Sequence, residues 1–379
     1  MWMLVGSYSK EGNPGGITVF NAAGQQVTKV GAGDRQIEAG YLTHGAGKVY
    51  SVDERKGDGR GPVGPVVGIH AFDFDVATGE LTWEHMAPAF GAFPTYLDFE
   101  QRQGLLTCAS HGSFEHVQQI VKRDGQWAVE FQYDDSTVTV YDAALNLQDV
   151  VVLSGHGMDP NSSPQAGGHA QSSAHAHCAT VDPSGHYVIV CDKGTDRILT
   201  YRLSKKLELV SSYAFAPETA PRHVAFNAKG DRLFVNLELA SSVASMEFDQ
   251  QTGALKLIDQ VETVSQPARV NEPAEIRIHP NGNTLYVNNR GEDAIVWFSI
   301  SDQGKLSRQG ALPLAASIHP GLAARSFMLS PDGHWLYLAD RPADLVRVYQ
   351  VGQHGELQEV GSVPVSQPAY VLLIDQQES

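Results

Sequence analysis

Short runs in which apolar and polar residues alternate recur along the whole chain, and this period of two predicts β-strands. Many of the runs come in pairs that are joined by a turn containing glycine. Residues 233–235, 285–287 and 336–338 are clear examples, because each run follows such a glycine by a few positions. A further strand and a further glycine turn follow each pair. We therefore expect an all-β protein with no helix of consequence.

The turn glycines repeat at a nearly constant interval. They are Gly47, Gly104, Gly185, Gly230, Gly282 and Gly333. The last four are separated by 45, 52 and 51 residues, which is the period of four-stranded propeller blades. The sequence thus predicts a repeat fold in which each blade begins with a hairpin.

Six turn glycines leave the two ends of the chain without a blade. Residues 369–375 resemble a lone first strand, whereas residues 3–8 and 16–20 resemble second and third strands that lack a first. Joining the two ends completes a seventh blade and removes the free edges of an open ring. We therefore predict a seven-bladed β-propeller formed by a single domain, residues 1–379.

One interval breaks the repeat. Gly104 and Gly185 are 81 residues apart, roughly thirty more than one blade requires. Part of the excess is a turn-rich stretch, residues 154–169, that leads into the strand beginning near His177. A long loop beside polar strand ends is more often functional than a simple connection.

The hairpins also predict a polar site. In two antiparallel strands, the first residue of one strand and the last residue of the next lie at the same end. The residues at these ends include His177, Arg222, Glu238 and Arg290 rather than apolar residues. If the blades surround an axis, these four side chains meet at one mouth of the channel.

Three further cations occupy corresponding positions in the repeat: Lys193, Arg325 and Arg341. They are candidates for widening a cationic substrate pocket, although solvation or a structural ion pair is the favoured role for them. Two interpretations of the main set stay open. The charges either form a structural ring of ion pairs between blades, or bind an anionic substrate through two arginines while His177 or Glu238 transfers a proton.

Histidines also raise the question of a metal site. His175 and His177 flank one strand start, of which we expect only His177 to act in the site, and His156 and His169 lie in the long loop. No set of Asp, Glu and His at ligand spacing accompanies them. We therefore expect no metal and no organic cofactor.

Composition and charge exclude several classes of partner. The net charge of −16 disfavours binding to nucleic acid or to an anionic membrane surface. Three cysteines are too few for a disulfide framework, no stretch is long and apolar enough for a membrane span, and the first residues are typical of a strand rather than of a signal peptide. These features favour a cytoplasmic protein.

At the polar strand ends the chain resembles a known family, the seven-bladed propeller lactonases. The similar segments are His177 with residues 182–185, residues 221–223, residues 238–243 and residues 288–290. The family includes bacterial 6-phosphogluconolactonase and a carboxymuconate-lactonizing enzyme. The resemblance implies a site of one histidine, two arginines and one glutamate, matched here by His177, Arg222, Glu238 and Arg290.

On this basis we expect a lactonase that hydrolyses a small sugar lactone. We expect this substrate to be anionic, and 6-phospho-gluconolactone is the best single candidate. Such a reaction needs a base for the attacking water, a positive group for the oxyanion and a proton for the leaving alkoxide. Two alternatives stay open. One is a cycloisomerase that closes or opens a lactone on an unsaturated dicarboxylate, and the other is a non-catalytic propeller that binds proteins.

Overall fold

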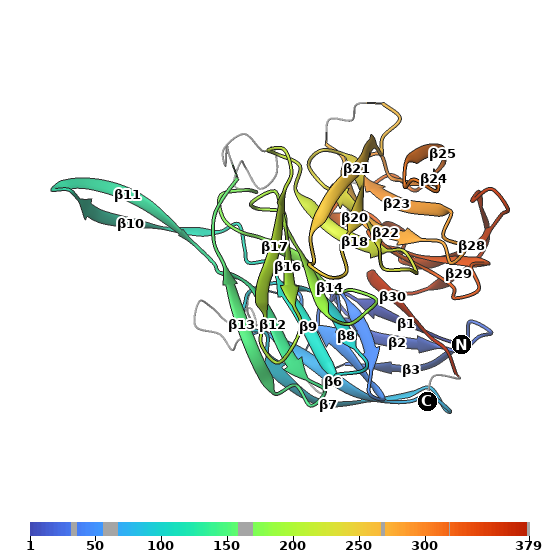
Figure 1. Ribbon diagram of the computed structural model, residues 1–379. Coiled ribbons are helices and arrows are strands. Elements are labelled where there is room, and N and C mark those ends of the chain that lie inside the picture. Colours follow the sequence, from blue (N-terminus) through green and yellow to red (C-terminus); the bar gives the residue numbers. More distant parts are fainter. Residues whose placement is uncertain (32–35, 56–66, 158–169, 267–269, 318, 377–379) are drawn as a thin grey trace.

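The structure is a computed structural model that describes residues 1–31, 36–55, 67–157, 170–266, 270–317 and 319–376. Its strands form seven four-stranded antiparallel sheets and one separate two-stranded ribbon (Figure 1). Helical structure in the described residues is limited to the short 3₁₀ turns η2 (Pro320–Leu322) and η3 (Arg341–Ala343). The predicted all-β propeller is confirmed. No helix in this part of the chain has the length and apolar character needed to cross a membrane.

In the first six blades the strands follow chain order from the channel outward. Blade one contains β4 (Leu42–Gly45), β5 (Lys48–Val52), β6 (Gly68–Asp75) and β7 (Glu80–Pro88). Blade two contains β8 (Pro94–Glu100), β9 (Leu105–Ser110), β12 (Ser136–Asp142) and β13 (Leu147–Leu153). Blade three contains β14 (Ala176–Val181), β15 (Tyr187–Asp192), β16 (Arg197–Arg202) and β17 (Glu208–Ala214). Blade four contains β18 (Pro221–Phe226), β19 (Arg232–Leu237), β20 (Ser242–Phe248) and β21 (Leu255–Glu262). Blade five contains β22 (Glu272–Ile278), β23 (Thr284–Arg290), β24 (Ala294–Ile300) and β25 (Leu306–Pro313). Blade six contains β26 (Ser326–Leu329), β27 (Trp335–Asp340), β28 (Leu345–Val351) and β29 (Leu357–Pro364).

The seventh blade joins the two ends of the chain, as predicted. Its order is β30 (Pro368–Ile374), β1 (Trp2–Ser7), β2 (Gly16–Phe20) and β3 (Gln26–Val30). The innermost strand is therefore the last one of the chain, and it pairs antiparallel with β1 so that Leu4 lies opposite Leu372. The first strands of neighbouring blades contact one another in a closed ring, including β30 with β4 and with β26.

The predicted turn glycines are found in left-handed backbone conformations. Gly185 has φ 74° and Gly230 has φ 71°, and the amide of Gly185 donates to the carbonyl of Asp182 at 2.8 Å. An L side chain is disfavoured at such φ values, which explains why glycine recurs where the first strand turns into the second.

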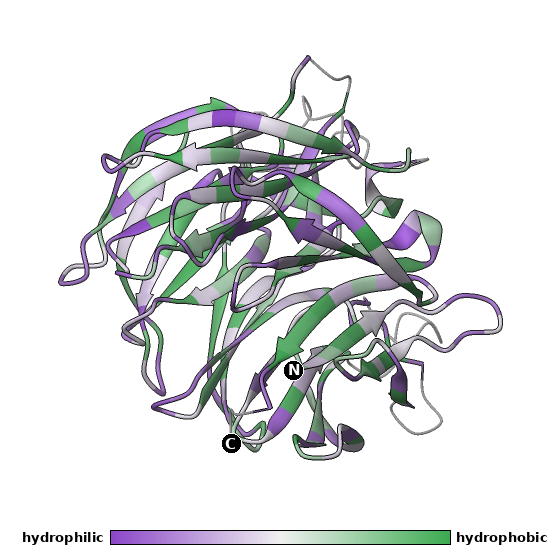
Figure 2. Ribbon diagram, turned by 90° about the vertical axis from the view of Figure 1, so that its right-hand side faces the viewer, coloured by the Kyte–Doolittle hydropathy of each residue, from purple (hydrophilic) through white to green (hydrophobic). Residues whose placement is uncertain are grey.

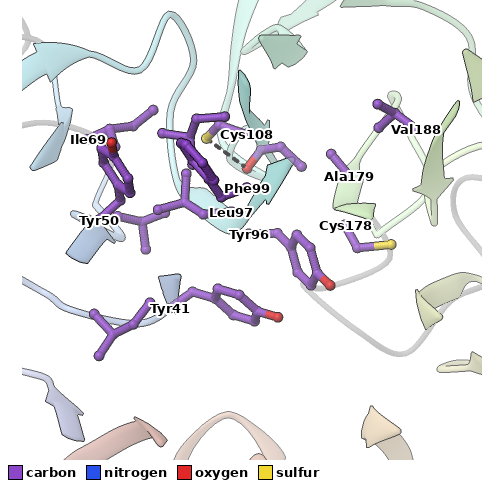
Figure 3. Close-up of a cluster of buried hydrophobic side chains, with 14 of the residues drawn as sticks. Tyr41, Tyr50, Ile69, Tyr96, Leu97, Phe99, Cys108, Cys178, Ala179 and Val188 are labelled. Atoms are coloured by element: carbon purple, nitrogen blue, oxygen red, sulfur yellow. Dashed lines mark hydrogen bonds between the residues drawn. The ribbon is translucent and has the colours of Figure 1, made fainter. Parts of the chain in front are cut away.

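The core lies between the faces of adjacent blades. Inner and second strands are largely buried on both faces, and the fourth strands mix exposed and partly buried positions. Figure 2 shows hydrophobic and hydrophilic residues interspersed along the strands. Aromatic rings fill the widening space between blades one and two, where Tyr50 stacks on Phe99 with 5.6 Å between ring centroids (Figure 3). This packing holds the first strands, and therefore their first residues, in fixed positions around the channel.

The ribbon β10 (His116–Arg123) and β11 (Gln126–Tyr133) is inserted between β9 and β12 of blade two. It accounts for part of the long interval that the sequence analysis left unassigned. The loop proposed there, residues 154–169, is described only as far as residue 157, and His169 lies outside the described residues.

Candidate active site

Polar side chains gather at one end of the channel, where the second strand of each blade ends. The residues at or just after these ends are Tyr8, Glu54, His111, Lys193, Glu238, Arg290 and Arg341. The last four of these positions were predicted from the sequence, but Tyr8, Glu54 and His111 were not. The hairpin rule points to Glu54 and His111, and the predicted joining of the two chain ends points to Tyr8.

Glu238 is the centre of an ion-pair cluster. Its carboxylate lies 2.5 Å from Lys193 Nζ, 2.8 Å from Arg222 Nε and 3.3 Å from Arg290 Nη2. Arg290 also pairs with Glu272 at 2.9 Å. Residues from three blades therefore meet here, and the four predicted charges Lys193, Arg222, Glu238 and Arg290 do lie together.

The cations change the chemistry of Glu238. Burial alone raises the pKa of a carboxyl group, but the charges of Lys193, Arg290 and Arg222 together hold the pKa of Glu238 well below its usual range. A carboxylate with such a low pKa is a weak base. Glu238 is therefore held as a carboxylate that faces three cations.

His177 begins a chain of three polar side chains. Its Nδ1 atom lies 3.2 Å from His223 Nε2, and His223 Nδ1 lies 3.5 Å from Glu275 Oε1. Arg222 Nη1 also lies 3.4 Å from His223 Nε2. His223 and Glu275 were not singled out as site residues from the sequence.

These contacts assign the ring protons. A guanidinium group can only donate, so His223 Nε2 is an acceptor and His223 Nδ1 carries the proton that faces Glu275. In this arrangement His177 Nδ1 donates to His223 Nε2 and shares the lone pair of that atom with Arg222 Nη1. The lone pair of His177 is left on Nε2, which is the arrangement a general base requires.

Both imidazoles are neutral in this arrangement. Burial lowers the pKa of His223 to about 4, and the Arg222 charge adds to that effect. Burial, followed by the charge of Arg222, also holds the pKa of His177 well below its ordinary value. A neutral His177 is able to accept a proton at any pH near neutrality.

β-bulges aim these side chains into the channel. The pairing of β14 with β15 shifts between Ala176 and Cys178, and the pairing of β18 with β19 shifts between Pro221 and Val224. Residues two apart share a face in a regular strand, so the bulge at His177 is what separates it from His175. His175 is buried, stacks on His111 at 4.5 Å between ring centroids and is not among the residues that line the cavity, whereas His177 is.

A second polar group lies across the channel from His177. Glu54 Oε2 accepts from Tyr8 Oη at 2.6 Å and from Arg325 Nη2 at 2.6 Å. Burial raises the pKa of Glu54 to about 8, although Arg222 lowers it. Arg341 lies on the other face of the Tyr8 ring and donates to Gln367 at 2.9 Å, so it borders the site without lining the cavity.

The cavity between these groups is small and has an aromatic floor. It measures about 20 Å³ and is lined by His177, Arg222, Glu54 and Arg325, among others. This volume suits one water molecule. The rings of Tyr41 and Tyr370, 4.0 Å apart, separate it from a cavity of about 380 Å³ farther along the channel.

No metal centre is found in the described residues, which contain no cluster of three or more His, Cys, Asp or Glu side chains arranged to hold an ion. His156 Nδ1 instead lies 2.6 Å from the carbonyl oxygen of Gly157.

Comparison with known proteins places the chain in a family. A family profile described as "Lactonase, 7-bladed beta-propeller" matches residues 2–373. A 6-phosphogluconolactonase of Bacillus subtilis is 29% identical over 257 residues, which are 67% of this chain and 63% of that protein. A 6-phosphogluconolactonase of Formosa agariphila is 23% identical over 377 residues, covering 94% of this chain and 95% of the relative.

A solved structure shares the fold. The periplasmic gluconolactonase of Pseudomonas aeruginosa superposes with a TM-score of 0.78 at 22% identity, over 98% of both chains. The match to the family profile covers nearly the whole chain, and the seven blades agree with it. The chain therefore belongs to the seven-bladed β-propeller lactonase family.

Proposed function

We propose that this protein hydrolyses a sugar lactone, with 6-phospho-gluconolactone as the best candidate. The observation that carries the proposal is the alignment of Glu275, His223 and His177, which leaves a lone pair on Nε2 of His177, a residue that lines one cavity together with Arg222 and Arg325. A base and two cations around one small cavity are the groups that hydrolysis of a lactone requires.

His177 is the general base in this proposal. Its Nε2 atom takes a proton from water as the water oxygen attacks the lactone carbonyl carbon. The charge that then develops on the imidazolium is shared with His223 and Glu275 through the contacts at 3.2 and 3.5 Å. His223 and Glu275 thus act as positioning residues that hold the correct tautomer.

Arg222 and Glu54 supply the positive charge for the oxyanion and the proton for the leaving alkoxide. Arg222 stabilises the oxyanion of the tetrahedral intermediate, and the ring C–O bond then breaks. Glu54, whose pKa is about 8, is largely protonated at neutral pH and donates a proton to the leaving alkoxide. His177 releases its proton to solvent and Glu54 regains one, which balances the hydrolysis.

An anionic substrate fits the remaining charges. In the part of the chain that the structure describes, Arg325 contacts a single acidic side chain, that of Glu54, and its own side chain is 18% exposed, compared with 4% for Arg222. A phosphate or carboxylate on the substrate is expected to compete with Glu54 for Arg325 and to open the small cavity. Its negative charge also offsets the cations that lower the pKa of His177.

The names of the relatives support this class of substrate. The chain matches only 63% of the Bacillus subtilis protein, and both 6-phosphogluconolactonase relatives are distant, so the phosphorylated substrate is part of the proposal. A cytoplasmic location is part of the proposal too, and it rests on the relatives named 6-phosphogluconolactonase, whereas the Pseudomonas relative is described as periplasmic.

A lactone panel tests the proposal. Hydrolysis of 6-phospho-gluconolactone, gluconolactone and a muconolactone is followed against the spontaneous rate, using the parent and a His177→Asn variant. We expect the phosphorylated lactone to have the highest kcat/KM and the variant to lose about 10²- to 10⁴-fold in kcat. Turnover of the muconolactone alone would instead favour a cycloisomerase, and equal rates for parent and variant on every lactone would favour a binding protein.

A further inference from the structure

The ribbon β10–β11 carries Trp127 and Phe131 on one face, and the opposite face includes Val117 but no aromatic side chain. Residues that pair across the two strands share a face. Ile120 pairs with Val129, Gln118 with Phe131 and Lys122 with Trp127, and these pairs form one face. We call the side chains of Ile120, Trp127, Val129 and Phe131 the apolar ribbon face.

The opposite face is held together by polar contacts. Gln119 donates to Gln132 at 2.6 Å, and Arg123 forms an ion pair with Glu130. Both strands pair only with each other among the described residues. Figure 1 shows the ribbon extending away from the blades, so the blades do not cover its apolar face.

The side chains of the apolar ribbon face are strongly exposed. Trp127 is 73% exposed, Ile120 67%, Val129 54% and Phe131 48%. A two-stranded ribbon by itself is at best marginally stable in water, and contiguous exposed apolar side chains commonly mark an interaction site. The ribbon therefore needs a partner surface to be well ordered.

Charge favours a second copy of the chain as that partner. The whole chain carries a net charge of −16, so most surfaces of two copies repel each other. On the ribbon, Lys122 and Arg123 balance Asp124 and Glu130. Two ribbons can thus meet without bringing like net charges together.

The area is also adequate. With about 150–250 Å² for each large aromatic side chain, the four side chains of the apolar ribbon face expose roughly 400 Å². Packing two such faces together removes roughly 800 Å² from water, and the flanking Gln118 and Lys122 side chains bring the total near the ~1,000 Å² that a specific interface requires. A contact of this size is expected to give a dimer of moderate affinity.

We propose that the protein forms a two-fold symmetric dimer in which the apolar ribbon faces of two copies pack against each other. The inference depends on none of the chemistry proposed for the channel. It is tested by sedimentation velocity at about 1 to 100 μM protein. The parent should sediment as a species of twice the 41.0 kDa chain mass at the upper concentrations.

Two matched variants separate the faces of the ribbon. Ile120→Lys places a charge on the apolar ribbon face, and Gln119→Lys places the same charge on the adjacent position of the polar face. Ile120→Lys should be monomeric throughout the range, whereas Gln119→Lys should dimerise like the parent. Trp127→Ser serves as a second variant if Ile120→Lys does not fold, as judged by its circular dichroism spectrum.

A disulfide experiment gives an independent readout. The three native cysteines are buried, so a cysteine added to the ribbon reacts alone. Under mild oxidation Val129→Cys should give at least about tenfold more covalent dimer than Gln119→Cys. Three results would each overturn the proposal: a monomeric parent at 100 μM, a dimeric Ile120→Lys variant, or equal cross-linking from both faces. A ribbon that binds a different protein instead would give the first of these results.

Discussion

His177 Nδ1 and His223 Nε2 lie 3.2 Å apart although the two residues are 46 positions apart in the chain. They begin the first strands of neighbouring blades, and Glu275 continues the chain of contacts in the next blade. Three successive repeats thus each contribute one member of a proton-positioning chain. The repeat supplies the geometry, and the residue type at each equivalent position supplies the chemistry.

Removing the carboxylate that orients His223 should slow turnover without weakening binding. In Glu275→Gln the side-chain amide can donate to His223 Nδ1, which favours the wrong tautomer. We expect kcat to fall by about 10- to 1,000-fold with little change in KM. Steady-state kinetics on the best lactone check this, with Glu272→Gln as control because Glu272 contacts Arg290 rather than a histidine. An unchanged kcat in Glu275→Gln would remove His223 from the mechanism.

The two predicted arginines should behave differently. Arg222 lines the cavity, whereas Arg290 does not and instead bridges Glu238 and Glu272. Arg222→Lys keeps the charge but loses the planar fork, so kcat should fall if Arg222 stabilises the oxyanion, and KM should rise if it binds a substrate anion. The same kinetic measurement on Arg290→Lys should show a smaller change in both constants.

Arg290 should matter more for stability. Arg290→Met leaves two buried carboxylates with fewer cations and should lower the free energy of unfolding by about 3–5 kcal/mol. Arg202→Met is the control, because the Arg202 side chain is 53% exposed and its contact with Glu208 is 3.7 Å long. Denaturation in urea measures both variants, and a loss no larger than that of the control would show that the ion-pair cluster contributes little to folding.

Acidification should destabilise the protein partly through His175. Burial lowers the pKa of His175 from 6.5 to about 4 in the folded chain, so the unfolded chain binds the proton first as pH falls. The contribution of this residue is complete above pH 6.5 and is lost between pH 6.5 and 4, by up to ~3 kcal/mol. His175→Gln should therefore lose less stability than the parent over this range in urea titrations, and the exposed His354→Gln should follow the parent.

Closure of the ring should depend on the last strand. Deleting residues 369–379 removes nearly all of β30 and exposes the edge of β1, which should give insoluble or much less stable protein. Deleting residues 376–379 leaves β30 in place and should have little effect. Thermal melting of the soluble fractions compares the two truncations, and an unchanged melting temperature in the longer deletion would contradict the role of this closure.

Lactone hydrolysis should survive removal of metal ions, since the proposed groups are all side chains. Prolonged dialysis against a chelator is expected to leave kcat unchanged. Activity that is lost and then restored by a single divalent ion would revive the hypothesis of a metal site at His156 and His169.

The sequence alone predicted the blades, the closure by the two termini and four of the charged positions at the channel mouth. These features depend on local patterns: alternation in strands, glycine at positive φ in turns, and the rule that hairpin partners end at the same side. The ribbon was also within reach of this reasoning, because Asp124 and Gly125 lie between two alternating runs and form a strong hairpin signal.

Only the tertiary structure decided which charges meet. Glu238 gathers Lys193, Arg222 and Arg290 and so loses its capacity as a base, and Arg325 reaches Glu54 across 271 positions of the chain. Sequence spacing does not predict these pairings, because they depend on how far each blade is rotated about the axis and on the irregular strand pairing near these residues. Desolvation in the closed ring then sets the pKa values, which is a property of the whole fold and not of any one strand.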